Sequence, residues 1–200
     1  MTTRSVLLDF GNVIAFFDHR KACRQLAELS TAAMTADDIY MAIFNTSLEE
    51  AYDTGRMSTP AFLDALRTTL HLQADDDEIA RAWCDIFTPN DAMAEAVPAL
   101  KARGLRLVLA SNTNALHYGW FGREFADTLS LLDAQVLSYQ VGCRKPDPQF
   151  FRACLTAAGC PAAECLYVDD REDLVVAGHK LGLHGLVYTP AVDVLAHTCY

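Results

Sequence analysis

The sequence has no paired-cysteine motif. Its 200 residues include seven cysteines, an odd number, and no two of them are spaced C-x-x-C. Disulfide-stapled and zinc-binding domains usually show such pairs, so we expect neither feature here. We predict reduced thiols in a cytoplasmic protein.

Long apolar runs and positive charge are also scarce. No uninterrupted apolar stretch reaches the ~18 residues that a membrane-spanning helix needs, and no charged-then-apolar leader opens the chain. Lysine and arginine number 16 against 26 aspartates and glutamates, which gives a net charge of −10. Nucleic acids and anionic membranes attract basic surfaces, so we expect neither as the main partner.

The chain does contain enough apolar residues for one sizeable domain, or for a core with a small insert. Hydrophobic residues make up 52% and charged residues 21%, without internal repeats, as in globular proteins. A chain of this length buries roughly 70% of the surface that its unfolded form exposes. It therefore needs no covalent staples.

Several apolar runs end in polar residues. Val6–Asp9 ends in a carboxylate, Leu105–Ala110 is followed by Ser111 and Asn112, and Leu166–Val168 is followed by Asp169-Asp170. Such runs are typical of buried strands, and ligands of open α/β sheets bind at the carboxyl ends of strands. A hydroxyl and several carboxylates, together with a lysine, suit a phosphate and a divalent cation.

The pattern between about residues 20 and 87 is helical, and it resembles an insert that covers the strand ends. Asp75 to Glu78 form an acidic run there, which we interpret as the start of a helix because acids favour helix N-termini. After residue 88 strands and helices alternate, which predicts a mostly parallel α/β sheet. The predicted domains are an α/β core at 1–15 and 88–200 and a helical cap at 16–87. The expected helices are 36–44, 62–70, 92–102, 148–158 and 174–181, and further strands are expected at 134–141 and 185–188.

Asp9 is the candidate nucleophile, because a carboxylate can attack phosphorus. Gly11 behind it lets the backbone approach a phosphate closely. The alternative is a carboxylate that caps the turn. Lys145 lies in a turn between prolines, where it either neutralises a phosphate as a point cation or remains a solvated loop lysine.

The polar residues after the later strands have similar alternatives. Ser111 and Asn112 either donate hydrogen bonds to phosphate or cap a helix that begins near Ala115. The pair Asp169-Asp170 either binds Mg²⁺, which usually takes one or two carboxylates, or caps the helix that follows. His117 either contacts the substrate or is structural.

Taken together, these motifs resemble those of a haloacid-dehalogenase-superfamily hydrolase with a small helical cap over a Rossmann-like parallel-sheet core. The motif sequences are most similar to those of α-glucose-1-phosphate phosphatase-like members. The matching segments are Asp9-Phe10-Gly11-Asn12-Val13, Ser111-Asn112-Thr113-Asn114 with His117, Lys145-Pro146, and Asp169-Asp170.

The resemblance implies an Mg²⁺-dependent phosphatase that acts on a small phosphorylated metabolite, possibly a sugar phosphate. It implies that Asp9 forms an aspartyl-phosphate and that Lys145 assists this chemistry. Magnesium would be held by Asp9, Asp170 and the carbonyl oxygen of Gly11. The substrate would contact Gly11, Asn12, Ser111, Asn112 and His117.

The chain departs from the family pattern at two positions. Most phosphatase members carry a second aspartate where Gly11 stands, and Asp or Asn where Leu174 stands; Asp173 is one residue off. Two alternatives therefore stay open: a metal-independent dehalogenase in which Asp9 attacks carbon, and a non-catalytic binding protein with the same fold. The sequence leaves the oligomeric state open.

Overall fold

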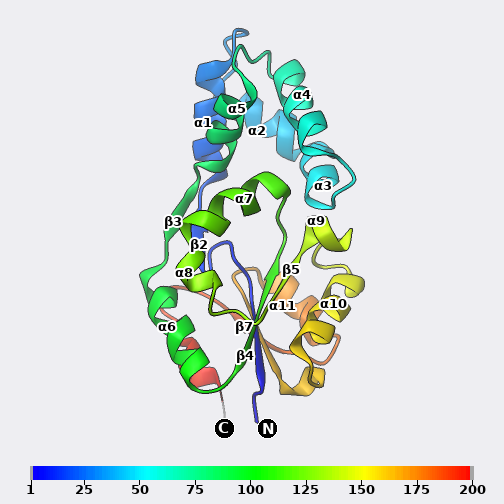
Figure 1. Ribbon diagram of the computed structural model, residues 1–200. Helices are drawn as coiled ribbons and strands as arrows, with labels where there is room; N and C mark the ends of the chain where they lie inside the picture. The colour runs from blue at the N-terminus through cyan, green and yellow to red at the C-terminus, as the bar shows by residue number, and fades with distance from the viewer. Residues whose placement is uncertain (1, 199–200) are drawn as a thin grey trace.

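The computed structural model describes residues 2–198, which form a helical cap over an α/β core (Figure 1). The core contains a five-stranded sheet with the order β5-β4-β1-β6-β7, and all its neighbouring strands are parallel. The strands are β1 (Ser5–Leu8), β4 (Arg106–Ser111), β5 (Ala134–Leu137), β6 (Cys165–Asp169) and β7 (His184–Val187). The α/β fold with a helical insert after the first strand is thus confirmed.

The register of the sheet places the predicted strand ends together. Leu8 of β1 lies opposite Leu109 of β4 and Val168 of β6. The residues that follow in each strand therefore leave the sheet at the same edge. Sequence-distant polar side chains meet there because parallel strands share one carboxyl end.

Helices cover both faces of the sheet, so the central strands β1 and β6 are buried along their whole length. Val6 and Leu8 belong to a hydrophobic cluster that includes residues of α6. Leu7 faces the other way, into a cluster with Phe150 and Cys154 of α10. The core helices are α6 (Asp91–Ala102), α7 (Ala115–Glu124), α8 (Ala126–Leu129), α9 (Ser138–Val141), α10 (Pro148–Ala158) and α11 (Glu172–His179), with short 3₁₀ turns at Ala162–Glu164 and Val194–His197.

The cap is a bundle of five helices with a hydrophobic core of its own, built around the fully buried Trp83. Several ends of these helices have the expected capping residues. Thr35 and Asp75 form capping boxes, so the acidic run at Asp75 starts a helix as predicted. The helices are α1 (His19–Leu29), α2 (Ala36–Phe44), α3 (Leu48–Asp53), α4 (Thr59–Thr69) and α5 (Asp76–Cys84).

Two features of the chain differ from the sequence-based expectation. An antiparallel ribbon of β2 (Ala15–Phe17) and β3 (Phe87–Pro89) joins cap and core, and three-residue strands give no usable periodicity. The predicted strand at 134–141 ends at Leu137, and the rest forms α9. The buried Ser138 hydroxyl accepts from the Thr113 N–H and donates to its carbonyl, which ties the first residue of α9 to the loop after β4.

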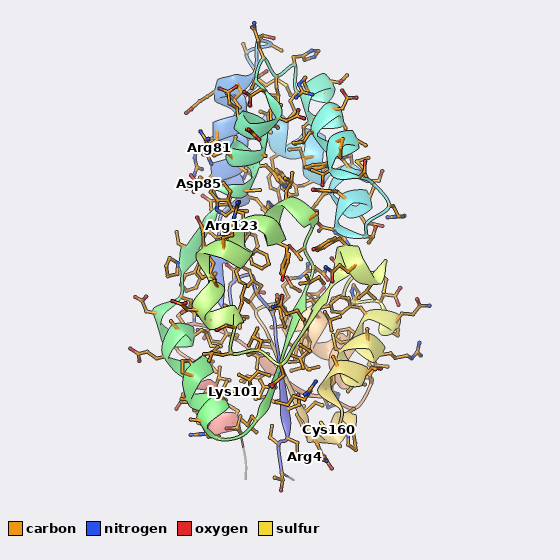
Figure 2. All side chains as sticks on the ribbon, viewed as in Figure 1. Arg4, Arg81, Asp85, Lys101, Arg123 and Cys160 are labelled. Atoms are coloured by element: carbon orange, nitrogen blue, oxygen red, sulfur yellow. The ribbon has the colours of Figure 1, made fainter. Side chains whose placement is uncertain are left out.

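The six described cysteines are free thiols, whereas Cys199 lies outside the described residues. Cys160 and Cys165 have sulfur atoms 3.4 Å apart, and Figure 2 shows Cys160 at the end of the core away from the cap. Within residues 2–198, no helix combines the length and apolarity needed to cross a membrane.

Candidate active site

Lys145 joins the ends of two strands. Its ammonium nitrogen lies 2.9 Å from Oδ1 of Asp9 and 2.7 Å from Oδ2 of Asp169. The side chain is only 1% exposed, so the solvated-loop interpretation does not hold. A buried lysine with two carboxylate partners is a fixed positive charge beside Asp9.

Asp169 anchors this lysine. It is fully buried, and the phenol of Tyr167 also donates to its Oδ2, while the Arg171 N–H donates to Oδ1 at 2.9 Å. These donors occupy both carboxylate oxygens. Asp169 therefore holds Lys145 in place and does not line the cavity.

Asp170 is the second carboxylate that can face a cation beside Asp9. The ligand oxygens of Asp9, Asp169 and Asp170 all lie within 4.8 Å of one another. Asn12, in the left-handed backbone region with φ 55°, donates from Nδ2 to Oδ2 of Asp170 at 2.9 Å. Asn12 thus fixes the orientation of Asp170.

These oxygen atoms suit a divalent cation. Oδ1 of Asp9 accepts hydrogen bonds from Lys145 and from the Phe10 N–H, and within the described residues no hydrogen bond reaches Oδ2. Asp170 offers a further carboxylate, and Mg²⁺ prefers such oxygen ligands. Asp173, by contrast, is exposed and paired with Arg171 at 2.7 Å.

The charges of the site depend strongly on one another. Burial, followed by the neighbouring Asp169, raises the pKa of Asp9 to about 7 although Lys145 opposes the shift. Burial alone would lower the pKa of Lys145, but Asp9 and Asp169 outweigh it and raise that pKa. A bound cation would favour the ionised form of Asp9 and so oppose this rise in its pKa.

Asn112 connects β4 to the loop that carries Lys145. Its Nδ2 donates to the Lys145 carbonyl at 3.0 Å, and the Lys145 N–H donates to its Oδ1 at 2.8 Å. Ser111, at the end of β4, is 2% exposed and has its hydroxyl 3.5 Å from the Asn112 carbonyl. The helix-capping alternative belongs instead to Asn114, which accepts from the His117 N–H.

A cavity of about 340 Å³ begins at this cluster and extends to the cap. The sequence-predicted residues that line it are Asp9, Gly11, Ser111, Asn112, His117, Lys145 and Asp170. Asn12 is not among the lining residues, because its side chain turns to Asp170. The individual substrate contacts stay predictions.

His117 lies in the wall of the cavity with both ring nitrogens engaged. Nδ1 is 3.2 Å from the Asn114 amide nitrogen, and Nε2 is 3.2 Å from the Trp83 carbonyl oxygen. A carbonyl can only accept, so we assign the proton to Nε2. Burial lowers the pKa of His117 to about 3, which leaves a neutral ring.

Sequence reasoning assigned no role to four polar residues of this region. Tyr167 shares a strand face with Asp169 at spacing i, i+2, a signal that could have found it. Arg144 precedes Lys145, and it lines the cavity together with Glu49 and Asp53 of α3. The two acids gave no signal, because acids in a short helix usually face solvent.

The chain resembles known hydrolases over most of its length. The sequence profile of the haloacid dehalogenase-like hydrolases matches residues 3–182. A D-ribitol-5-phosphate phosphatase from Bacteroides thetaiotaomicron is 27% identical over 185 residues, which cover 90% of this chain and 88% of the relative. A sesquiterpene phosphatase from Aspergillus oryzae is 26% identical over 161 residues, or 75% of this chain and 76% of the relative.

A solved structure shares the fold. A haloacid dehalogenase family enzyme from Bacteroides thetaiotaomicron, in complex with magnesium and inorganic phosphate, superposes with a TM-score of 0.84. It is 19% identical, and the match covers 98% of each chain.

Proposed function

This chain belongs to the haloacid dehalogenase-like hydrolases, and we propose that it is a Mg²⁺-dependent phosphatase of a small phosphorylated metabolite, acting through an aspartyl-phosphate on Asp9. The observation that carries the proposal is the position of Lys145, 2.9 Å from Asp9 and 2.7 Å from Asp169, with Asp170 in the same cluster. The named phosphatase relative and the magnesium–phosphate complex support it.

The chain's own residues divide the work. Asp9 attacks phosphorus through Oδ2, since Lys145 and the Phe10 N–H hold Oδ1. The bond from phosphorus to the leaving oxygen breaks, and that oxygen takes up a proton from water. Water then cleaves the aspartyl-phosphate and regenerates Asp9. Lys145 and the Ser111 hydroxyl bind phosphate oxygens. When bound, Mg²⁺ neutralises phosphate charge, and Asp9, Asp170 and the Gly11 carbonyl would hold it.

The leaving group departs without an aspartate at position 11. General acid–base catalysis contributes about 10²–10⁴-fold, so phosphates with good leaving groups depend less on it. A sugar bound through its anomeric oxygen is such a leaving group. We therefore include α-glucose-1-phosphate-like substrates, as well as the polyol phosphate that the relative's name indicates.

The test is a phosphate-release screen of sugar, polyol, terpenyl and aryl phosphates with Mg²⁺ or with excess chelator. We expect turnover that disappears in chelator, returns with Mg²⁺ and falls below detection in Asp9→Asn. Asp173→Asn is the matched control, because Asp173 is exposed and forms an ion pair with Arg171; its activity should remain within about twofold, the near-neutral effect of an exposed ion pair.

The other outcomes select the alternatives. Chelator-insensitive release of halide from haloacids would favour a dehalogenase in which Asp9 attacks carbon. A folded protein that hydrolyses no ester or haloacid would favour a non-catalytic role. Wild-type turnover in Asp9→Asn would exclude the proposed nucleophile.

A further inference from the structure

The end of the cavity away from Asp9's sheet edge is formed by the cap and is strongly polar. Glu49 and Asp53 come from α3, and Arg144 from the core loop reaches both. Its Nη1 lies 3.8 Å from Oε2 of Glu49 and 3.6 Å from Oδ2 of Asp53. Figure 1 shows α3 seated above the core beside α9.

These carboxylates keep acceptor capacity. Asp53 is 6% exposed and receives one short hydrogen bond, from the Asn114 amide at 3.0 Å. Within the described residues, Glu49 receives no hydrogen bond, and Arg144 at 3.8 Å is its only cationic partner. The Glu49 side chain is 22% exposed, and both acids line the cavity, so their oxygens can accept hydrogen bonds from water or from the donors of a bound ligand.

Aromatic rings form part of the remaining cavity wall. Phe17, Phe87 and Phe121 line it together with the neutral His117. Such rings favour the C–H surface of a ligand. The cavity thus combines flat apolar walls with a charged end that has both acceptors and a guanidinium donor.

The names of the two phosphatase relatives indicate substrates of opposite polarity, a polyol phosphate and a sesquiterpene. A hydrocarbon placed against Glu49, Asp53 and Arg144 would remove water from charged groups without replacing its hydrogen bonds, which is unfavourable. A hydroxyl can donate to a carboxylate and accept from a guanidinium. A second anion would be repelled by Glu49 and Asp53. An ammonium group would be attracted by both acids and repelled by Arg144, so an amine-bearing ester is the alternative that a test must include.

We propose that Glu49, Asp53 and Arg144 select a leaving group that carries hydroxyls, such as a polyol or sugar. This inference rests on the proposed phosphatase function. The phosphate lies at Asp9 and Lys145, the carbon chain lies along the phenylalanines, and distal hydroxyls reach the cap. Glu49 and Asp53 are specificity-determining residues in this arrangement.

The protonation of the cap end fits this role. Burial, then Asp53, raises the pKa of Glu49 to about 7 although Arg144 opposes the shift, and the neighbouring Glu50 adds to it. Burial raises the pKa of Asp53 to about 6 against the Asn114 hydrogen bond and Arg144. A hydroxyl can bond to either form, because it both donates and accepts.

The experiment compares kcat/KM for a pentitol 5-phosphate and n-pentyl phosphate, which have equal chain lengths. Glu49→Leu should lower kcat/KM for the pentitol ester by about 10–100-fold, the usual effect of losing a hydrogen bond to a charged group. The same substitution should leave kcat/KM for the pentyl ester unchanged or raise it. Glu49→Gln, which keeps one acceptor oxygen, should restore part of the loss.

Glu50→Leu is the matched control. Glu50 is the next residue of α3 and contacts Arg144 at 3.4 Å, but it does not line the cavity. Glu50→Leu should change kcat/KM for the two esters equally and by little. If Glu49→Leu and Glu50→Leu lower kcat/KM for both esters to the same extent, these residues only hold the cap on the core, and the inference is wrong.

Three other outcomes bear on the inference. Faster wild-type hydrolysis of pentyl than pentitol ester overturns it, and so does a preference for ethanolamine phosphate over glycerol phosphate. If no ester is hydrolysed, the proposed function fails. Titration calorimetry, which measures the affinity of each ester for the Asp9→Asn variant, then tests the inference separately. Tighter binding of the pentitol ester than of the pentyl ester supports it, and equal affinity overturns it.

Discussion

At the scale of single residues, burial decides the protonation of His117. The ring is almost enclosed, it stacks on Trp83 with centroids 4.9 Å apart, and its nitrogens contact Asn114 and the Trp83 carbonyl. Desolvation, with a smaller contribution from the nearby His19, lowers its pKa from 6.5 to about 3. At a pH between these two values, His117 is therefore protonated in the unfolded chain and neutral in the folded protein.

This difference predicts a pH dependence of stability. Between pH 6.5 and 3 the unfolded state holds more protons, so the free energy of unfolding falls as pH falls. From pH 6.5 to 4.5 the contribution of His117 is about 2 kcal/mol. His117→Gln should lose less stability than the wild type over this interval, measured by urea unfolding. Equal losses in both proteins would contradict the assignment, since other groups titrate in both.

At the scale of elements, β2 explains why a glycine lies two residues after Asp9, the proposed nucleophile. A Cβ built on Gly11 would lie 2.6 Å and 2.9 Å from two ring atoms of Phe17. Its backbone does not have the positive φ of Gly55 or Gly104. The Phe17 ring, which packs on His19 with centroids 4.7 Å apart, thus occupies the space that a second aspartate would need.

Gly11→Ala is therefore expected to lower the free energy of unfolding by about 1–3 kcal/mol, the usual cost of overpacking. In a Phe17→Ala background the same substitution should cost little, and a denaturation double-mutant cycle measures the difference. Gly119→Ala is the control, because a Cβ there meets nothing within 4 Å. A Gly11→Ala cost that is the same in both backgrounds would show that Phe17 is not the obstacle.

At the scale of the whole molecule, function depends on how the cap sits on the core. Besides the β2–β3 ribbon, the cap contacts the core through α5, whose Trp83 stacks on His117 of α7, and through the segment after α3. A Cβ on Gly55 would lie 2.3 Å from the Tyr139 carbonyl oxygen of α9, and Gly55 has φ +67°. The phenol of Tyr52 accepts from the Leu116 N–H at 3.2 Å nearby. These contacts place Glu49 and Asp53 over the cavity.

Gly55→Ala should displace the cap. It adds left-handed strain of about 1–2 kcal/mol and a clash with core backbone, so we expect lower kcat/KM and faster proteolysis within the cap. Gly104→Ala is the matched control, since φ is +75° and a Cβ there meets nothing within 4 Å. It should show the strain alone, in thermal unfolding, with normal activity. Identical behaviour of the two variants would argue against the Tyr139 contact.

The sequence by itself determined the features that depend on near neighbours along the chain. Apolar runs marked the five core strands, and the parallel arrangement followed from their alternation with helices. The acidic run at Asp75 marked a helix start because capping is local. The resemblance of motifs to a known family placed Asp9, Lys145 and Asp170 in one site, and the structure does bring them together.

Only the tertiary structure decided what fills the space around those residues. Asp169 became the partner of Lys145, and Asn12 turned to Asp170, through contacts between residues far apart in sequence. Phe17 excluded a side chain at position 11, and α3 brought Glu49 to the cavity, although neither has a local signal. The physical reason is that burial and side-chain packing depend on distances in space, which hydrophobic periodicity and capping patterns do not encode.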